Sequence, residues 1–200
     1  MECFTVLTGH AAPVPMANLD TDMMIRVDRS AGVPRAELGR YALESWRFRA
    51  DGSPNPDCAL NLAAYAAPRI LVGGENFGCG SARETAVWAL HGMGIRSVIA
   101  PSFGGAFYEN CFGNGMLPIE LPAAEVAALM ALVGHHPVLT VDLERQEIRG
   151  EGLTLPFAVE PLRRRMLLEG LDQIGLSLTR AAAIADFQAR DALRRPWLAA

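Results

Sequence analysis

The stretch from Arg69 to Ala100, RILVGGENFGCGSARETAVWALHGMGIRSVIA, decides the fold. It begins with the apolar run RILVGG, which has the length and composition of a buried strand. A glycine-rich turn then leads into a segment from Ser81 to Leu90 that predicts a helix, and the glycines of GMG end this helix. The next apolar run, IRSVIA, predicts a second strand. A strand–helix–strand unit of this kind indicates a parallel sheet with a helix packed on it.

The same alternation continues toward the C-terminus. The segment SFGGAFYENCFGNG predicts a helix, MLPIEL a third strand and EVAALMALV another helix. Alternating apolar residues in VLTVDLERQEIRGEGLTLPFAV then predict hairpin-like antiparallel strands. The remaining sequence is helical, with a glycine break near Gly170 to Gly175 and arginine clusters that we assign to solvated faces. We expect an α/β fold with a mixed sheet, formed by one domain over residues 1–200 with a helical C-terminal extension over about 160–200.

Composition excludes several classes of function. The 200 residues are half apolar, and the net charge of −4 lacks the basic footprint of a nucleic-acid-binding protein. No apolar run approaches the roughly 18 residues of a membrane span. The N-terminus has no signal-peptide pattern, so we expect a cytoplasmic protein. The cysteines are scattered without a CxxC pair, which argues against a metal or iron–sulfur site built by this chain alone; they are Cys3, Cys58, Cys79 and Cys111.

The turn ENFGCGSARE does not match a nucleotide-binding motif. It holds no lysine for a phosphate loop, and Arg83 stands where a dinucleotide fingerprint has its third glycine. A glycine turn at the start of a helix nevertheless leaves backbone N–H groups free to bind an anion. Because Arg83 adds a guanidinium that can grip a carboxylate, the turn predicts a site for a small carboxylate ligand.

Ser81 has two interpretations, which the turn alone leaves open. The sequence Ser81-Ala82-Arg83-Glu84 has the spacing of a capping box, in which the serine only caps the helix. Alternatively, Ser81 is a catalytic hydroxyl whose pKa is lowered by the helix-end amides and by Arg83, since no histidine is placed to activate it.

Six segments, in this order, resemble one known family. They are NLDTDMMI, SWRF, ENFGCGSARE, VIAPSFGGAFYENCFGNGMLPI, LTVDLE and GLDQIGLSL. Together they resemble the small subunit of 3-isopropylmalate dehydratase, the swivel-domain chain of the aconitase superfamily. The resemblance covers nearly the whole chain. It implies a swivelling β/β/α domain of the aconitase C-terminal type, with a mixed sheet and flanking helices. The implied activity is the isomerisation of 2-isopropylmalate and 3-isopropylmalate by dehydration and rehydration, a step of leucine biosynthesis.

The resemblance also implies a partner and a division of roles. A [4Fe-4S] cluster is expected on a separate large subunit, with no cofactor bound by this chain. Ser81, as an alkoxide, would remove the proton next to a substrate carboxylate, and Arg83 would bind a carboxylate. Asp22 matches an active-site acid of the superfamily, whereas Asp20 is expected to shape the turn.

Four further residues are implied to contact the substrate: Gly80, Ala82, Arg47 and Arg26. Two of them mark departures from the family pattern. Ala82 replaces a serine that would bind a carboxylate, although its backbone N–H remains, and Arg26 follows Met24-Ile25 where the family has Ile-Ile-Pro. Thr85 also replaces the usual histidine.

These departures keep two alternatives open. Arg26 and Arg29 in the loop that borders the variable group of the substrate suit a carboxylate better than an isopropyl group. A sibling hydro-lyase acting on homocitrate, citramalate or dimethylmalate is therefore one alternative. A non-catalytic carboxylate-binding module is the other.

Overall fold

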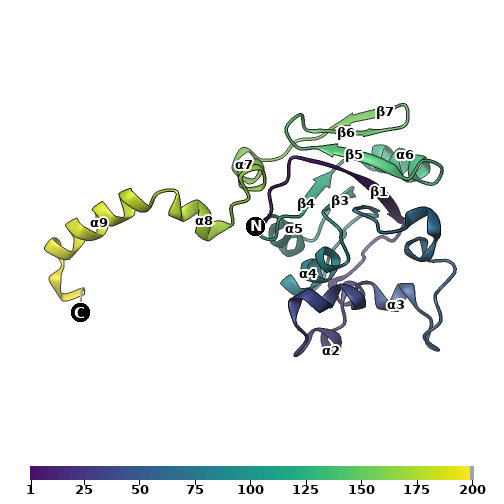
Figure 1. Cartoon of the computed structure of the whole chain (residues 1–200), viewed down its shortest axis with the longest axis horizontal. Coiled ribbons are helices and arrows are strands. Elements are labelled where there is room, and N and C mark those ends of the chain that lie inside the picture. The colour runs from purple at the N-terminus through teal and green to yellow at the C-terminus, as the bar shows by residue number, and fades with distance from the viewer. Residues whose placement is uncertain (199–200) are drawn as a thin grey trace.

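The structure, a computed structural model, describes residues 1–198 and is built around one mixed sheet of seven strands (Figure 1). The strand order is β4-β3-β2-β1-β5-β6-β7. The first four strands along the sheet run parallel, and β5, β6 and β7 continue it in antiparallel order. This arrangement confirms the predicted α/β class and the predicted change from parallel to antiparallel pairing. The strands are β1 (Val6–Val14), β2 (Ile70–Gly73), β3 (Ser97–Ala100), β4 (Leu117–Glu120), β5 (Val138–Asp142), β6 (Glu147–Gly150) and β7 (Leu153–Pro156).

Strand β1 was not predicted, although it lies in the middle of the sheet. It pairs with β2 in parallel, with Ala11 opposite Ile70, and with β5 in antiparallel, with Leu7 opposite Val141. The polar residues Thr8 to His10 interrupt its apolar pattern, which is why the segment lacks the appearance of a central strand. Because β1 joins the two halves, it makes them one continuous sheet.

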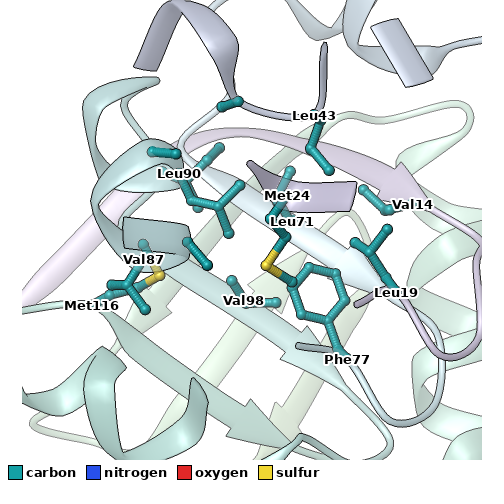
Figure 2. Close-up of a cluster of buried hydrophobic side chains, with 14 of the residues drawn as sticks. Val14, Leu19, Met24, Leu43, Leu71, Phe77, Val87, Leu90, Val98 and Met116 are labelled. Atoms are coloured by element: carbon teal, nitrogen blue, oxygen red, sulfur yellow. The ribbon is translucent and has the colours of Figure 1, made fainter. Parts of the chain in front are cut away.

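Helices cover both faces of the sheet. In β2, Leu71 points into one hydrophobic cluster and its neighbours Ile70 and Val72 into another, so the clusters lie on opposite faces. The first cluster packs α4 and the segments after β1 against the sheet (Figure 2). The main helices are α4 (Glu84–Gly92), α5 (Gly105–Gly113) and α6 (Ala123–Val133). The shorter ones are α1 (Thr21–Met24), α2 (Val27–Ser30), η1 (Arg35–Tyr41), α3 (Glu44–Arg47), η2 (Ala59–Asn61) and η3 (Ala63–Tyr65).

Helix α4 begins three residues later than predicted, at Glu84 instead of Ser81. Gly80 has a φ of +91°, and Arg83, the residue that precedes the helix, has an extended backbone. The predicted start of the helix was wrong because the glycine turn extends through Arg83. Hydrogen bonds of the turn itself hold it in this conformation. Ser81 is therefore part of the turn and not of the helix.

The C-terminal segment forms α7 (Pro161–Glu169), α8 (Gln173–Leu178) and α9 (Ala181–Arg194), followed by η4 (Pro196–Leu198). Gly170, with a φ of +68°, ends α7, so the break is shorter than predicted and Gly175 lies inside α8. Figure 1 shows α8 and α9 leading away from the sheet, and neither helix has a buried residue. No helix within residues 1–198 is long and apolar enough to cross a membrane.

Two of the predicted solvated arginines, Arg163 and Arg164, instead make structural contacts. The Arg163 guanidinium donates to the Glu109 carboxylate at 2.5 Å and lies 5.1 Å from the ring centres of Tyr108 and Phe112. These contacts attach α7 to α5 through a cation–π pair and an ion pair. Arg164 donates to the carbonyls of Leu143 and Glu144, at 3.1 and 2.7 Å, so the assignment of this cluster to a solvated face was wrong for Arg163 and Arg164.

Candidate active site

Three loops meet beyond the carboxyl ends of the parallel strands β1, β2 and β3. The backbone N–H of Gly78 donates to the carbonyl of Leu19 at 2.7 Å, which joins the loop after β2 to the loop after β1. The N–H of Phe77 donates to the Ser102 carbonyl at 3.0 Å, which joins it to the loop after β3. This edge is where open α/β sheets bind their ligands.

Buried side chains that pack beneath these loops hold the loops in place. Leu19, Met24 and Phe77 are fully or almost fully buried and pack together under the loops, as Figure 2 shows. Gly78 has a φ of +75°, and a Cβ atom there would lie 2.3 Å from the Cγ atom of Phe107. The close approach of the loop to α5 therefore requires glycine at this position.

Ser81 is exposed and does not cap the helix. The residue before α4 is Arg83, and no side chain caps this helix end. The hydroxyl of Ser81 has no hydrogen-bond partner within residues 1–198, and the residue belongs to the exposed part of the turn. The capping-box interpretation was thus wrong, which leaves the hydroxyl free to meet a ligand.

Glu84, the glutamate of the predicted capping box, has a different hydrogen-bond partner. The side-chain N–H of Asn114 donates to the Glu84 Oε1 atom at 3.0 Å. Asn114 Oδ1 in turn accepts from Arg35 Nη2 and from Trp88 Nε1, both at 2.9 Å. This network ties the first turn of α4 to the end of α5. No local sequence pattern indicates it, because its members are far apart along the chain.

Arg83 forms an ion pair with Asp22. The Arg83 Nη2 atom donates to Asp22 Oδ1 at 2.5 Å, and the Arg83 side chain is 24% exposed while that of Asp22 is 60% exposed. Within the described chain, Arg83 Nε and Nη1 are buried and lack an acceptor. Such groups cost about 1–3 kcal/mol each when they remain unpaired. The guanidinium therefore keeps donors beyond those that Asp22 uses.

Backbone groups of the turn complete the site. Gly80 and Ala82, on either side of Ser81, are exposed, and neither backbone N–H has an acceptor among residues 1–198. Asp20 has the expected structural role, because its carboxylate accepts the Met23 N–H at 2.7 Å and caps α1. The residues that the structure brings together are thus Gly80, Ser81, Ala82, Arg83 and Asp22.

Arg47 does not join this group. Its Nη1 atom donates to the Ala42 carbonyl at 3.2 Å and contacts the Met93 sulfur at 3.9 Å. Met93 follows the last residue of α4, whereas Arg83 precedes the first. Because the nine residues of α4 separate the two arginines, Arg47 lies at the opposite end of the helix.

Arg26 lines a hollow of about 640 Å³, whose lining includes Arg29, Glu44 and Phe48. Arg26 donates to both carboxylate oxygens of Asp28, at 2.9 and 2.8 Å, and this bond lowers the pKa of the Asp28 carboxyl. Arg29 donates to both oxygens of Glu44 in the same way, at 2.9 and 3.0 Å. Each guanidinium of the loop therefore already has a carboxylate partner.

The cysteines do not fit an iron–sulfur cluster. Cys58 and Cys111 are buried, and burial raises the pKa of the Cys111 thiol well above its usual range. Within residues 1–198 no group of three His, Cys, Asp or Glu side chains is arranged to hold a metal ion. A cluster needs three or four thiolates in one place, which residues 1–198 do not provide.

Two family models match the chain. The model of the aconitase C-terminal domain matches residues 1–124, which include all the residues of the site. The model of the C-terminal domain of the 3-isopropylmalate dehydratase small subunit matches residues 174–200, where α8 and α9 lie. The first match thus covers the parallel strands β1 to β4, and the second covers the end of the C-terminal segment.

Curated relatives span the whole chain. The 3-isopropylmalate dehydratase small subunit of Rhodospirillum rubrum is 51% identical, over 99% of this chain and 97% of the relative. The protein of the same name from Dinoroseobacter shibae is 50% identical, over 99% of this chain and all of the relative. The crystal structure of 3-isopropylmalate dehydratase from Methanocaldococcus jannaschii shares the fold, with a TM-score of 0.67 and 24% identity over 90% of this chain and 98% of that one. This chain belongs to the family of 3-isopropylmalate dehydratase small subunits.

Proposed function

We propose that this chain is the small subunit of a 3-isopropylmalate dehydratase, a hydro-lyase of leucine biosynthesis, and that it supplies the base of the reaction. The single observation that carries the proposal is the exposed Ser81 on the same glycine turn as Arg83, which is paired with Asp22 of α1. Full-length similarity to proteins named 3-isopropylmalate dehydratase small subunit supports the substrate. The enzyme works in the cytoplasm, with residues 1 to about 160 as the swivel domain and the remainder as its helical extension.

Ser81 takes and returns the proton. Its Oγ atom, as an alkoxide, removes the proton from the substrate carbon next to a carboxylate. The electrons of that C–H bond form the carbon–carbon double bond, and the hydroxyl group leaves from the adjacent carbon. Water then adds with its hydroxyl on the carbon that lost the proton, and Ser81 gives the proton to the carbon that lost the hydroxyl group, which completes the isomerisation.

The surroundings of Ser81 favour its ionised form. A serine hydroxyl is a weak acid, and each unit by which its pKa falls requires about 1.4 kcal/mol of preferential stabilisation of the alkoxide. The positive end of α4 and the Arg83 guanidinium lie on the same turn and both stabilise negative charge. The same donors would bind a substrate carboxylate, together with the exposed N–H groups of Gly80 and Ala82.

The partner is the large subunit, and we place the [4Fe-4S] cluster there. Bound to that partner, the cluster supplies the Lewis acid for the departing hydroxyl group. This chain contributes the proton acceptor and the carboxylate contacts, so neither of the two chains is active alone.

The arrangement of the arginines weighs against a more highly charged substrate. Arg26 and Arg29 each bind a carboxylate of this chain with two hydrogen bonds, so neither presents a free guanidinium to the third carboxylate of homocitrate. We keep Arg26 as a residue at the border of the substrate pocket. Arg47 would reach the substrate only if its contacts with Ala42 and Met93 changed.

Reconstitution with the cluster-bearing large subunit tests the proposal. The ultraviolet absorbance of the unsaturated intermediate follows the reaction, with 3-isopropylmalate compared with homocitrate and citramalate. We expect turnover of 3-isopropylmalate, and a loss of about a thousandfold or more in Ser81→Ala, as for other groups that act on the reacting atoms. Ser177→Ala, on exposed α8, is the matched control and should keep full activity. Undiminished turnover in Ser81→Ala would remove the serine from the mechanism.

A further inference from the structure

We propose that Thr21 is a positioning residue that holds the Ser81 turn in its reactive conformation. The inference rests on the proposed function of Ser81. Thr21 is 1% exposed and lies between Asp20, which caps α1, and Asp22, which pairs with Arg83. It is thus a buried residue between two aspartates whose roles are already assigned.

Thr21 binds the turn on both sides of Gly80. Its hydroxyl donates to the Ser81 carbonyl at 3.1 Å, and its backbone N–H donates to the Cys79 carbonyl at 3.0 Å. Gly80, between these two carbonyls, has a φ of +91°. A single residue therefore fixes the Cys79–Gly80 peptide before the left-handed glycine and the Ser81–Ala82 peptide after the serine.

These two bonds determine where the exposed N–H groups point. In a trans peptide the carbonyl and the following N–H lie on opposite edges of one plane. Because the Ser81 carbonyl is turned toward buried Thr21, the N–H of Ala82 is turned away from it. The bond to the Cys79 carbonyl turns the N–H of Gly80 outward in the same manner.

The hydroxyl of Thr21 thereby acts on the reaction through the backbone. Two outward N–H groups beside the Ser81 hydroxyl create a positive potential where the alkoxide and a substrate carboxylate would lie. Without the Thr21 hydroxyl, the Ser81 carbonyl keeps only its bond from the Arg83 N–H, at 2.8 Å. The Ser81–Ala82 peptide then gains freedom to rotate, and the alkoxide loses part of its stabilisation.

Three variants test this role in the enzyme reconstituted with its large subunit. Thr21→Val removes the hydroxyl and keeps the shape, and Thr21→Ser keeps the hydroxyl. Thr8→Val is the matched control, because the Thr8 hydroxyl shares a 2.9 Å hydrogen bond with Thr140, from β1 to β5. We expect kcat to fall about tenfold or more in Thr21→Val with KM within about threefold, and to be restored in Thr21→Ser and unchanged in Thr8→Val.

The pH profile separates positioning from general damage. A hydrogen-bond donor that stabilises an alkoxide lowers its pKa, so the acidic limb of kcat should move to higher pH in Thr21→Val, by about half a unit or more. In Thr21→Ser the limb should stay where it is in the wild type. A mere loss of folded protein would lower the amplitude without moving the limb.

The outcomes also separate this inference from the proposed function. If Ser81→Ala is inactive but Thr21→Val keeps its kcat and its pH limb, the positioning role is wrong and the serine base stands. If Ser81→Ala remains active, the proposed function fails whatever Thr21 does. If Thr21→Val does not fold, Thr21→Ser decides: a kcat reduced as in Ser81→Ala, despite the retained hydroxyl, would overturn the inference.

Discussion

Arg83 and Asp22 form an ion pair, with 2.5 Å between Nη2 and Oδ1, although they are 61 residues apart in the sequence. The pair joins the glycine turn after β2 to the short helix α1. It fixes the position of the Arg83 guanidinium and leaves Nε and Nη1 without an acceptor in the described residues. For the proposed role of Arg83 in binding a carboxylate, the pair orients the guanidinium before any substrate arrives.

Replacing Asp22 with Asn tests this orienting role. The neutral side chain no longer anchors the guanidinium, so we expect kcat/KM for 3-isopropylmalate to fall about tenfold or more. The free energy of unfolding should change by less than about 1 kcal/mol, because the pair is partly exposed. Steady-state kinetics with the large subunit and urea unfolding measure the two quantities. Asp191→Asn breaks a comparable pair with Arg195 on α9 and should leave the kinetics unchanged; equal effects of both variants would contradict a specific role for Asp22.

The glycine turn should not tolerate a side chain at Gly78. Ala at this position combines a φ of +75° with a Cβ atom 2.3 Å from the Phe107 ring, so we expect a loss of about 3 kcal/mol or more in the free energy of unfolding. Gly113→Ala, at the end of α5, is the control, since its Cβ meets no atom within 4 Å. It should be neutral or stabilising by up to about 1 kcal/mol. Urea unfolding checks both, and similar stabilities for the two variants would contradict the close packing of the turn on α5.

Much of the fold was predictable because its local signals agree with its tertiary structure. The apolar runs predicted as parallel strands are short and bounded by glycine or proline, and each forms a strand: β2, β3 and β4. Strand β1 was missed because its pairing with β2 and β5 stabilises it more than its own composition indicates. No local pattern in the sequence indicates such pairing between strands that are far apart along the chain.

The site was only partly predictable, for the same reason. The turn residues from Gly80 to Arg83 are neighbours in sequence, so their chemistry was visible. The capping box failed because Glu84 bonds to Asn114, 30 residues away, and Thr21 was missed because its acceptor is 60 residues away. Arg47 of α3 lies beside Met93, at the end of α4 far from Arg83. This position depends on how the segment around Arg47 packs on α4, which no short motif specifies.

His91 should make the protein less stable in mild acid. Burial, followed by the nearby positive charges of Arg96 and Arg35, lowers the pKa of His91 below its ordinary value of 6.5. The unfolded chain therefore binds a proton at a pH where the folded chain does not, and stability falls as the pH drops below about 6.5. His91→Gln removes this proton uptake, so its stability should fall less between pH 7 and pH 5. Chemical unfolding at several pH values measures the difference, and parallel curves for the two proteins would show that His91 does not contribute.

The cysteines should differ sharply in reactivity. Burial raises the pKa of both Cys58 and Cys111, whereas Cys3 is exposed. Since the thiolate is the reactive form, an alkylating reagent at pH 8 should modify Cys3 in the folded protein and reach the other two only after unfolding. Mass spectrometry of the digested protein identifies the modified sites. Rapid modification of Cys111 in the folded state would mean that α5 does not bury it.

Isotope exchange at the reacting carbon measures most directly whether the Ser81 oxygen removes the carbon-bound proton. The enzyme reconstituted with its large subunit is incubated with 3-isopropylmalate that carries deuterium on the carbon from which the proton leaves. The loss of deuterium from that carbon, to the neighbouring carbon or to the solvent, is followed by proton NMR. We predict exchange with wild type and with Ser177→Ala, and a loss of exchange by about a thousandfold or more with Ser81→Ala. Exchange at the wild-type rate with Ser81→Ala would contradict the role of Ser81 as the base.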